Sequence, residues 1–384
     1  MTIRHCLLGF TALAAWASLP TGAAAQIAVS ANDGKQVLVA GAQIVPTKPL
    51  PDTVSLIDMS VSPPRLIASI EAPTSVIGPP ASIAVSPDES IALVTSARKL
   101  SATDPSGIEP DDRVTVIDLK ARRVIATLQA GRGASGVSIS PDGLLALVAN
   151  RAEGTVSIFK ISGSTVTAVG KVRVGDEKSA PAEPIFFDGG KRALVSRDSD
   201  HRISVLTLVG TEATVSLQTL AGGLRPYQID TDGPRHYAVV GNIGGGGRDV
   251  DTVSLIDLTE GFPRIVDTVA VGLTPEGLKM SPDGRYVAVN VNNGSNADPK
   301  SPRYSDHGLL QIWRIDAGKL VKITEARIGG WGQGIAWSRD SRTLLVQCMI
   351  EQRLDVFTFK DERLERGAPI PMPAGPAAIR TAEP

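Results

Sequence analysis

The stretch ASGVSISPDGLLALV at residues 134–148 alternates apolar with small or polar residues on both sides of a Pro-Asp-Gly turn. Asp and Gly tolerate the backbone angles that reverse a chain between two strands, and Pro presets φ. The stretch therefore predicts a β-hairpin. Asp142 and its counterparts Asp88 and Asp283 are then expected to be turn formers rather than catalytic groups.

The same hairpin recurs along the chain. Clear copies are PASIAVSPDESIALV (80–94) and PEGLKMSPDGRYVAV (275–289), and looser ones are PAEPIFFDGGKRALV (181–195), PYQIDTDGPRHYAVV (226–240), GQGIAWSRDSRTLLV (332–346) and a seventh window that ends in ANDGKQVLV at Val39. Each hairpin precedes a third strand of matching character: TVSLIDM (53–59), RVTVIDL (113–119), TVSIFKI (155–161), RISVLTL (202–208), TVSLIDL (252–258), LLQIWRI (309–315) and RLDVFTF (353–359). A fourth strand usually follows, as in RVIATLQA at 123–130.

Four antiparallel strands in each repeat are typical of one propeller blade. The sequence therefore predicts an all-β, seven-bladed β-propeller. The expected blades are 26–78 with 375–384, then 79–131, 132–178, 179–222, 223–272, 273–330 and 331–374. Two segments compete for the inner strand of the first blade, IAVS at 27–30 and GPAAIRT at 375–381, and either one brings the two ends of the chain into one sheet.

A turn of the SPDG type followed by a TVSLID strand resembles the YVTN-type β-propeller repeat family, whose members are largely exported. The resemblance covers essentially the whole chain after residue 25. It implies the fold but says little about activity, because the motif consists of turn and core residues. Relatives of this architecture include seven-bladed lactonases, dehydrogenase subunits and surface-layer proteins.

The N-terminus has the features of a secretory signal. Arg4 and His5 precede the apolar run CLLGFTALAAWASL, which is too short to span a bilayer, and Ala23 and Ala25 fit a small-x-small cleavage pattern. We expect cleavage after Ala25 and a periplasmic or secreted protein. No later apolar run approaches the length of a membrane span, and Cys348 is then the one cysteine of the mature chain.

The 39 basic residues nearly balance the 40 acidic ones, so neither nucleic acid nor an anionic membrane is an expected partner. We expect a monomer that engages an envelope protein or a small polar ligand. No cofactor is predicted.

One face of the predicted ring is expected to carry the site. The Asp-containing turns mark the opposite face, which we call the plain face. On the other face, which we call the loop face, four connections between second and third strands are long: 40–52, 95–112, 241–251 and 290–308. Long surface connections are typical of binding surfaces, and neutral loop growth is the alternative.

The entries to the first strands predict a polar pocket at the central channel. Its expected lining is Glu183, Tyr227, Gln228, Glu276 and Gln333. Two carboxylates can hold a divalent cation, accept hydrogen bonds from a sugar or shift each other's pKa. The alternative is a solvated rim without a ligand.

Further polar side chains on the loop face are candidates for chemistry. The connection SRDSDH contributes Arg197 and His201, and the connection in the sixth blade contributes His307. Acid and imidazole groups in one cavity are suited to general-base hydrolysis. Their spacing matches no established metal motif, so no metal site is predicted.

Three functions follow as hypotheses. The first is a non-catalytic binding or scaffolding propeller of the cell envelope. The second is a lactonase-like hydrolase with Glu183 or Glu276 as base, assisted by Arg197 or His201, acting on a small lactone or sugar-derived substrate. The third is an accessory subunit of a periplasmic redox enzyme, in which a c-type haem in this chain is not expected because no C-x-x-C-H motif is present.

Overall fold

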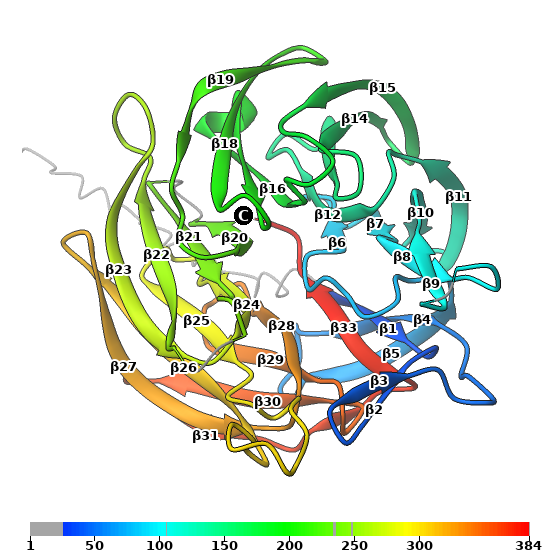
Figure 1. The fold of residues 1–384 in the computed structure, drawn as a ribbon, viewed down its shortest axis with the longest axis vertical. Helices are drawn as coiled ribbons and strands as arrows, with labels where there is room; N and C mark the ends of the chain where they lie inside the picture. The colour runs from blue at the N-terminus through cyan, green and yellow to red at the C-terminus, as the bar shows by residue number, and fades with distance from the viewer. Residues whose placement is uncertain (1–25, 105, 233–235, 247–248, 384) are drawn as a thin grey trace, which may run out of the picture.

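The computed structural model describes residues 26–104, 106–232, 236–246 and 249–383. The expected signal segment, residues 1–25, lies outside them. The described strands form seven antiparallel blades, each built on four strands. Figure 1 shows the blades arranged as a ring. The predicted fold class is confirmed, and the described residues contain no α-helix, only the short 3-10 turn Asp188–Gly190.

Four strands make up each blade, from the channel outwards. The first two blades contain β33 (Gly375–Arg380), β1 (Ile27–Asp33), β4 (Thr53–Asp58) and β5 (Arg65–Glu71), then β6 (Ile83–Val85), β7 (Ile91–Thr95), β10 (Arg113–Asp118) and β11 (Arg123–Gln129). The third and fourth contain β12 (Ala134–Ile139), β13 (Leu145–Asn150), β14 (Thr155–Ser162) and β15 (Thr165–Arg173), then β16 (Pro181–Phe187), β17 (Arg192–Arg197), β18 (Arg202–Val209) and β19 (Glu212–Leu220).

The remaining blades follow the same order. The fifth and sixth contain β20 (Pro226–Thr231), β21 (Tyr237–Asn242), β22 (Asp251–Asp257) and β23 (Arg264–Gly272), then β24 (Pro275–Met280), β25 (Tyr286–Val291), β26 (Gly308–Asp316) and β27 (Lys319–Ile328). The seventh contains β28 (Gly332–Trp337), β29 (Thr343–Cys348) and β30 (Arg353–Lys360), whose outer edge pairs with both β31 (Arg363–Arg366) and β32 (Ile370–Pro371).

The first blade corrects one sequence expectation. Its inner strand is β33 from the C-terminus, which pairs antiparallel with β1 from Val29↔Arg380 to Asp33↔Gly375. The segment from Ile27 therefore forms the second strand, and the window ending at Val39 does not. Val37–Val39 is instead β2, which forms a separate small hairpin with β3 (Ala42–Ile44). The turn-like Asn-Asp-Gly at 32–34 misled the alignment of the repeats, because here it ends a strand rather than joining two.

Two repeated hydrogen-bond patterns explain the sequence motif. In the plain-face turns a serine hydroxyl donates to the aspartate two residues later, at 2.6 Å for Ser86–Asp88 and 2.5 Å for Ser140–Asp142. At the end of a second strand, Asn150 Nδ2 donates to the hydroxyls of Thr155 and Ser157, both at 2.9 Å. The Thr-Val-Ser spacing thus places two hydroxyls on one face of the strand for the buried asparagine.

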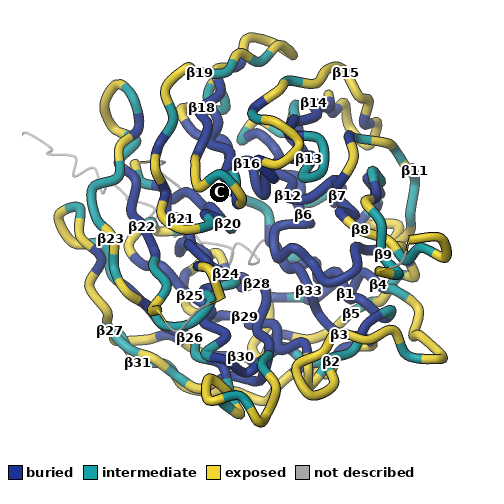
Figure 2. The backbone as a smooth tube through the Cα atoms, viewed as in Figure 1, coloured by how far each residue is buried: buried dark blue, intermediate teal, exposed yellow. Residues whose placement is uncertain are grey.

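The apolar core lies between neighbouring blades. Between the second and third blades, for example, Leu93 and Val114 pack in one cluster with Val137 and the fully buried Phe159. Burying one such side chain contributes roughly 1.5–3 kcal/mol. Figure 2 shows the inner strands almost wholly buried, whereas the outer strands contain both exposed and partly buried residues. Residues free to vary for function therefore lie at strand ends and connections.

Candidate functional site

Two insertions form a cap on the loop face. The hairpin β2–β3 belongs to the connection between β1 and β4, and a second hairpin, β8 (Arg98–Leu100) with β9 (Ile108–Pro110), belongs to the connection between β7 and β10. Leu38 from the first hairpin and Leu100 from the second pack against Trp331 and Met349 of the seventh blade. Trp331 is thus buried beneath the cap, and Figure 1 shows the two hairpins extending from neighbouring blades.

A cavity of about 350 Å³ opens beside this cap, and we call it the mouth cavity. Its walls come from the second, third, fifth and sixth blades. They consist of Ile77, Gly78, Pro79, Ala97, Arg98, Ser135, Arg151, Arg225, Tyr227, Ile243, Gly246, Thr274 and Glu276. A neighbouring cavity of about 440 Å³ shares Gly246 and Thr274 with it. The loop face therefore carries a hollow at the position expected for a propeller site.

An ion-pair cluster organises one wall of the mouth cavity. Asp198, fully buried in the fourth blade, accepts hydrogen bonds from Arg225 Nε at 2.7 Å and Nη2 at 3.2 Å, and it also pairs with Arg151. Burial opposes ionisation, but the hydrogen bonds from both guanidinium groups hold the pKa of Asp198 below its ordinary value. One carboxylate thereby fixes two arginines from two other blades.

Two of the residues expected in the pocket lie in this cavity. Glu276 is half-buried, and burial raises its pKa to about 7, although Arg225, Arg151 and Arg98 act in the opposite direction. Asn292 Nδ2 lies 3.4 Å from Glu276 Oε2. Tyr227 has Arg151 over its ring at 5.7 Å, and burial together with the charge of Glu276 raises the pKa of its hydroxyl. Glu276 is thus a carboxyl group that changes protonation near neutral pH.

The structure does not bring the other expected pocket residues into this wall. Glu183 and Gln228 occupy equivalent positions in consecutive blades and bridge to the next blade. Glu183 Oε2 accepts from the Ile229 amide at 2.8 Å, and Gln228 Oε1 accepts from the Leu278 amide at 2.8 Å. Gln333 is buried in the seventh blade, outside the lining of the mouth cavity. Glu183 and Gln228 thus connect inner strands of neighbouring blades, and Gln333 lies buried in an inner strand.

The remaining candidates also lie apart from the mouth cavity. Arg197 pairs with Asp200 at 2.7 Å and donates to Ser204 at 3.1 Å, so it ties the fourth blade together. His201 is exposed, and its Nδ1 accepts from the Arg225 amide at 3.2 Å. His307 Nδ1 lies 2.6 Å from the exposed Asp306. None of the three side chains lines the mouth cavity that contains Glu276.

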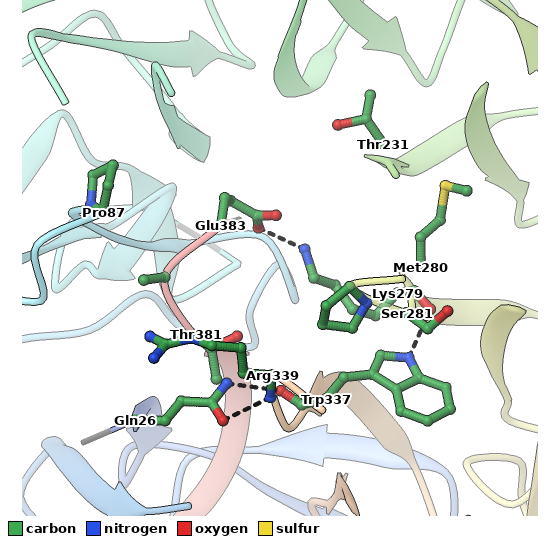
Figure 3. Close-up of a pocket in the computed structure, with 12 residues that line it drawn as sticks. Gln26, Pro87, Thr231, Lys279, Met280, Ser281, Trp337, Arg339, Thr381 and Glu383 are labelled. Carbon is green, nitrogen blue, oxygen red and sulfur yellow. Dashed lines mark hydrogen bonds and ion pairs between the residues drawn. The ribbon is translucent and has the colours of Figure 1, made fainter. Parts of the chain in front are cut away.

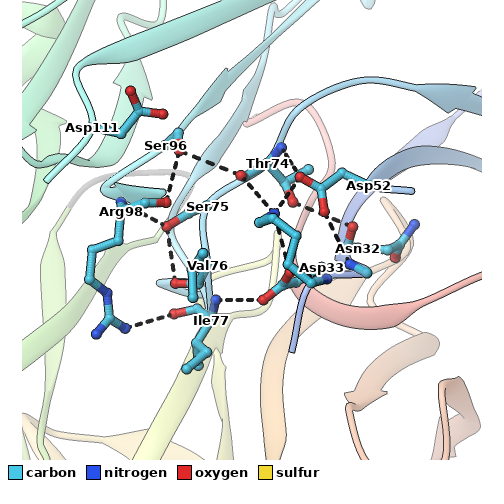
Figure 4. Close-up of polar contacts among 12 residues, drawn as sticks. Asn32, Asp33, Asp52, Thr74, Ser75, Val76, Ile77, Ser96, Arg98 and Asp111 are labelled. Atoms are coloured by element: carbon cyan, nitrogen blue, oxygen red, sulfur yellow. Dashed lines mark hydrogen bonds and ion pairs between the residues drawn. The ribbon is translucent and has the colours of Figure 1, made fainter. Parts of the chain in front are cut away.

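The cap holds the rim of the mouth cavity in place (Figure 4). Asp33 Oδ2 accepts from the Ile77 amide at 2.8 Å, and the Val76 amide donates to the Arg98 carbonyl at 3.0 Å. The Ser75 hydroxyl accepts from the Arg98 amide at 3.3 Å. Lys35 lies between Asp33 and Asp52 and forms an ion pair with each. The backbone that carries Arg98 is therefore held by the connection between β5 and β6, and the Asp33 carboxylate at the end of β1 holds that connection in turn.

The plain-face end of the channel is filled by charges. Lys279 donates to Asp230 at 2.8 Å and to Glu383 at 2.5 Å, and Arg380 pairs with Glu183 at 2.7 Å. Figure 3 shows Lys279, Glu383 and Trp337 around a cavity of about 260 Å³ on this face, which we call the plain-face cavity. The buried carboxylates of Glu183 and Asp230 are thus already paired with cations of the same chain.

The described ranges hold no group of three or more His, Cys, Asp or Glu side chains placed to bind a metal ion. The divalent cation considered from the sequence therefore has no identified site. Within the same ranges, no helix is long and apolar enough to cross a membrane.

The sequence patterns did not point to Arg98, Arg151 and Arg225. Arg225 immediately precedes the first strand of the fifth blade, two positions before Tyr227, and Arg151 immediately follows the second strand of the third blade. Aligning both positions across the repeats would have found them. Arg98 lies in an insertion without a counterpart in the other blades, so no repeat signal marks it.

Known structures share the fold at low sequence identity. A putative 6-phosphogluconolactonase from Bacteroides fragilis has a TM-score of 0.70 and 14% identity over 95% of this chain and 99% of its own. The periplasmic gluconolactonase of Pseudomonas aeruginosa has a TM-score of 0.66 and 15% identity over 94% and 100%. A functionally unknown protein from Desulfotomaculum acetoxidans has a TM-score of 0.68 and 15% identity over 93% and 99%. No family model and no curated protein matches the sequence.

Proposed function

We propose that this protein is a small-molecule-binding propeller whose mouth cavity takes one polar ligand. The observation that carries the proposal is the convergence of Arg98, Arg151, Tyr227 and Glu276, from four different blades, on one cavity of about 350 Å³. Ligand sites are typically concave and of this size, with a few convergent polar groups whose pKa values are perturbed. The plain-face charges, by contrast, are paired among themselves.

Two unpartnered donors support a ligand at this position. Ser135 Oγ and Arg151 Nη1 belong to residues of the cavity wall, are buried, and have no hydrogen-bond partner among the described residues. A buried donor without an acceptor costs roughly 1–3 kcal/mol. A polar ligand that accepts from either group would recover part of that cost.

A calorimetric titration tests the proposal with three probes: glucose, gluconate and glucose 6-phosphate. We expect saturable binding of at least one probe, and loss of that binding when Thr274→Trp fills the cavity. Thr103→Trp adds the same indole to an exposed turn of the cap and serves as the control. Absence of binding by all three probes, or full binding by the Thr274→Trp variant, would contradict the proposal.

Lactone hydrolysis is the second candidate function, because the pKa of Glu276 near 7 suits a general base. The Glu276 carboxylate would take a proton from water while the water oxygen bonds to the lactone carbonyl carbon. The bond between the carbonyl carbon and the ring oxygen then breaks. The ring oxygen receives the proton that Glu276 took from water, which gives a hydroxy acid. Arg98 and Arg151 are the cations with donors available to stabilise the oxyanion. The gluconolactonase and the putative 6-phosphogluconolactonase among the similar structures support this candidate by analogy of fold.

An assay of glucono-1,5-lactone hydrolysis, in which the released acid is measured, tests this candidate. We expect Glu276→Gln to reduce the catalysed rate at least a hundredfold while Glu183→Gln, in protein that remains folded, retains it. Equal rates for Glu276→Gln and the unmodified protein would remove Glu276 as the base.

The cellular location belongs to the same proposal. Export, with cleavage after Ala25, would place the mouth cavity in the periplasm or outside the cell. Mass spectrometry of the protein recovered from the periplasmic fraction tests this, because the expected N-terminus is Gln26. An uncleaved chain in the cytoplasmic fraction would contradict it.

A further inference from the structure

We propose that the mouth cavity recognises its ligand through an anionic group, a carboxylate or a phosphate, held by Arg98 and Arg151 with Ser135. The inference rests on the proposed function, because it names the chemical class of the ligand that the cavity takes. Its support comes from the balance of charges, from unused donors and from the rigidity of the rim.

The charged side chains of the site leave a positive excess. Three guanidinium groups, those of Arg98, Arg151 and Arg225, face two carboxyl groups, those of Asp198 and Glu276. Asp198 is buried and held ionised by its two arginine partners. With Glu276 ionised the set carries one net positive charge, and with Glu276 protonated it carries two. A bound anion would therefore neutralise the positive excess of these five side chains.

The three arginines differ in how many of their guanidinium N–H donors already have an acceptor. Arg225 directs both Nε and Nη2 at Asp198, so these two donors are already engaged. Arg151 directs Nη2 at Asp198 but leaves Nη1 without an acceptor among the described residues. Arg98 makes no ion pair within the described ranges, and its guanidinium contacts the Ile77 carbonyl at 3.5 Å. Arg98 and Arg151 are thus the two groups with free donors for an anion.

A serine adds a neutral donor in the same wall. Ser135 is 1% exposed, and its Oγ has no hydrogen-bond partner among the described residues. Ser135 lies in the first strand of the third blade, and Arg151 directly follows the second strand of that blade. Two guanidinium groups and a hydroxyl are suited to the several acceptor oxygens of a carboxylate or a phosphate.

The rim that carries Arg98 is preorganised. Its backbone is fixed by hydrogen bonds to Ser75 and Val76, and the adjoining Ile77 amide is held by Asp33 (Figure 4). Arg151 is fixed by Asp198 from the other side. Because the Arg98 backbone and the Arg151 guanidinium are held before the ligand arrives, less conformational entropy is lost on binding.

Calorimetry with matched probes tests the inference. Gluconate presents a carboxylate, glucose 6-phosphate presents a phosphate, and glucose presents only hydroxyls. We expect at least one of the two anions to bind more than tenfold more tightly than glucose. A preference for one anion over the other identifies which group the site accepts.

Variants assign the effect to the arginine. Arg98→Gln should remove at least tenfold of the anion's advantage and leave glucose binding unchanged, whereas Arg98→Lys should retain part of the advantage. Lys99→Gln is the control, because Lys99 is the adjacent exposed cation, pairs with Glu109 at 3.3 Å and lies outside the cavity lining.

The outcomes separate this inference from the proposed function. If glucose binds in the mouth cavity as tightly as both anions, or if Arg98→Gln leaves the preference intact, the anion site is wrong while small-molecule binding stands. If no probe binds, both proposals fail.

Discussion

Arg380 Nη2 donates to Glu183 Oε1 at 2.7 Å, so the last strand of the chain is tied by a buried ion pair to the inner strand of the fourth blade. Both side chains are almost fully buried. Burial raises the pKa of Glu183 to about 7, and Arg380 and the Ile229 amide act against this rise. A carboxylate that the sequence marks as a possible catalytic base is therefore a link across the ring.

Removing one partner of this ion pair should destabilise the protein. Glu183→Gln keeps an acceptor for the Ile229 amide but leaves the Arg380 guanidinium buried and unpaired, which costs about 3–5 kcal/mol. Urea unfolding measures the loss. The double variant Glu183→Gln, Arg380→Gln should recover part of it, since no unpaired charge remains. A single variant as stable as the unmodified protein would show that the pair does not hold the ring.

Ring closure by β33 should be essential for a monomeric fold. Deleting 375–384 removes the inner strand of the first blade and leaves the edge of β1 unpaired, which favours association between chains. Size-exclusion chromatography should show aggregates or unfolded protein. Deleting 382–384 removes Glu383 but keeps β33, and Lys279 retains Asp230, so this control should stay monomeric. A monomeric, folded 375–384 deletion would contradict the closure.

The cap should depend on close contact at Gly41. This glycine has φ +78°, and a Cβ there would overlap the backbone of Asp298 in the sixth blade. Gly41→Val should therefore separate the β2–β3 hairpin from that loop and speed hydrogen exchange at the Met349 amide beneath the cap. Gly107→Val is the matched control, because Gly107 has φ +73° but nothing within 4 Å of the added Cβ. Equal exchange in the two variants would mean that backbone strain, not the contact, is responsible.

Glu276 should give the site opposite pH dependences for hydrolysis and for anion binding. Its pKa is about 7, so the ionised base is depleted below pH 7 and the rate constant of base-assisted hydrolysis should fall about tenfold per pH unit there. The same protonation removes a negative charge beside Arg98, Arg151 and Arg225, so gluconate, whose carboxylate stays ionised in this range, should bind more tightly at pH 6 than at pH 8. Tyr227 stays neutral throughout this range, and Asp198 stays ionised.

The Glu276→Gln variant is the control for both pH profiles. It should remove base-assisted hydrolysis and bind gluconate with little pH dependence between pH 6 and pH 8. A pH dependence of binding that is the same in this variant would assign the titration to another group.

The raised pKa of Glu276 also predicts a slope in stability. Between the ordinary glutamate value of 4.5 and about 7, the folded protein binds more protons than the unfolded chain, so the contribution of Glu276 to stability declines as the pH rises through this window. Glu276→Gln should flatten the dependence of the unfolding midpoint on pH relative to the unmodified protein. A steeper dependence in the variant would contradict the assignment.

The repeat was predictable because its physics is local. Ser140 and Asp142 close a turn within one hairpin, and Asn150 meets the hydroxyls of Thr155 and Ser157 only a few residues away. The ring follows from repeating such units. The inner strand of the first blade was left open because β33 and β1 lie at opposite ends of the sequence, and no local signal ranks one above the other.

The mouth cavity was only partly predictable for the converse reason. Tyr227 and Glu276 occupy the second position of a first strand and were found by alignment of the repeats. Glu183 and Gln228 occupy the next position, where the alternation of a strand turns the side chain towards the neighbouring blade. Arg98 is brought to the cavity by an insertion whose backbone is held by Ser75, and the Ile77 amide beside it is held by Asp33. These contacts join segments too far apart in the sequence to leave a local pattern.

Crystallographic soaking with a set of polar fragments tests the central claim most directly, because it works without a known ligand. We expect fragments to gather in the mouth cavity, within hydrogen-bond distance of Glu276, Arg98 or Arg151, and acidic fragments to be enriched there. Fragments that instead occupy the plain-face cavity beside Lys279 and leave the mouth cavity empty would contradict it.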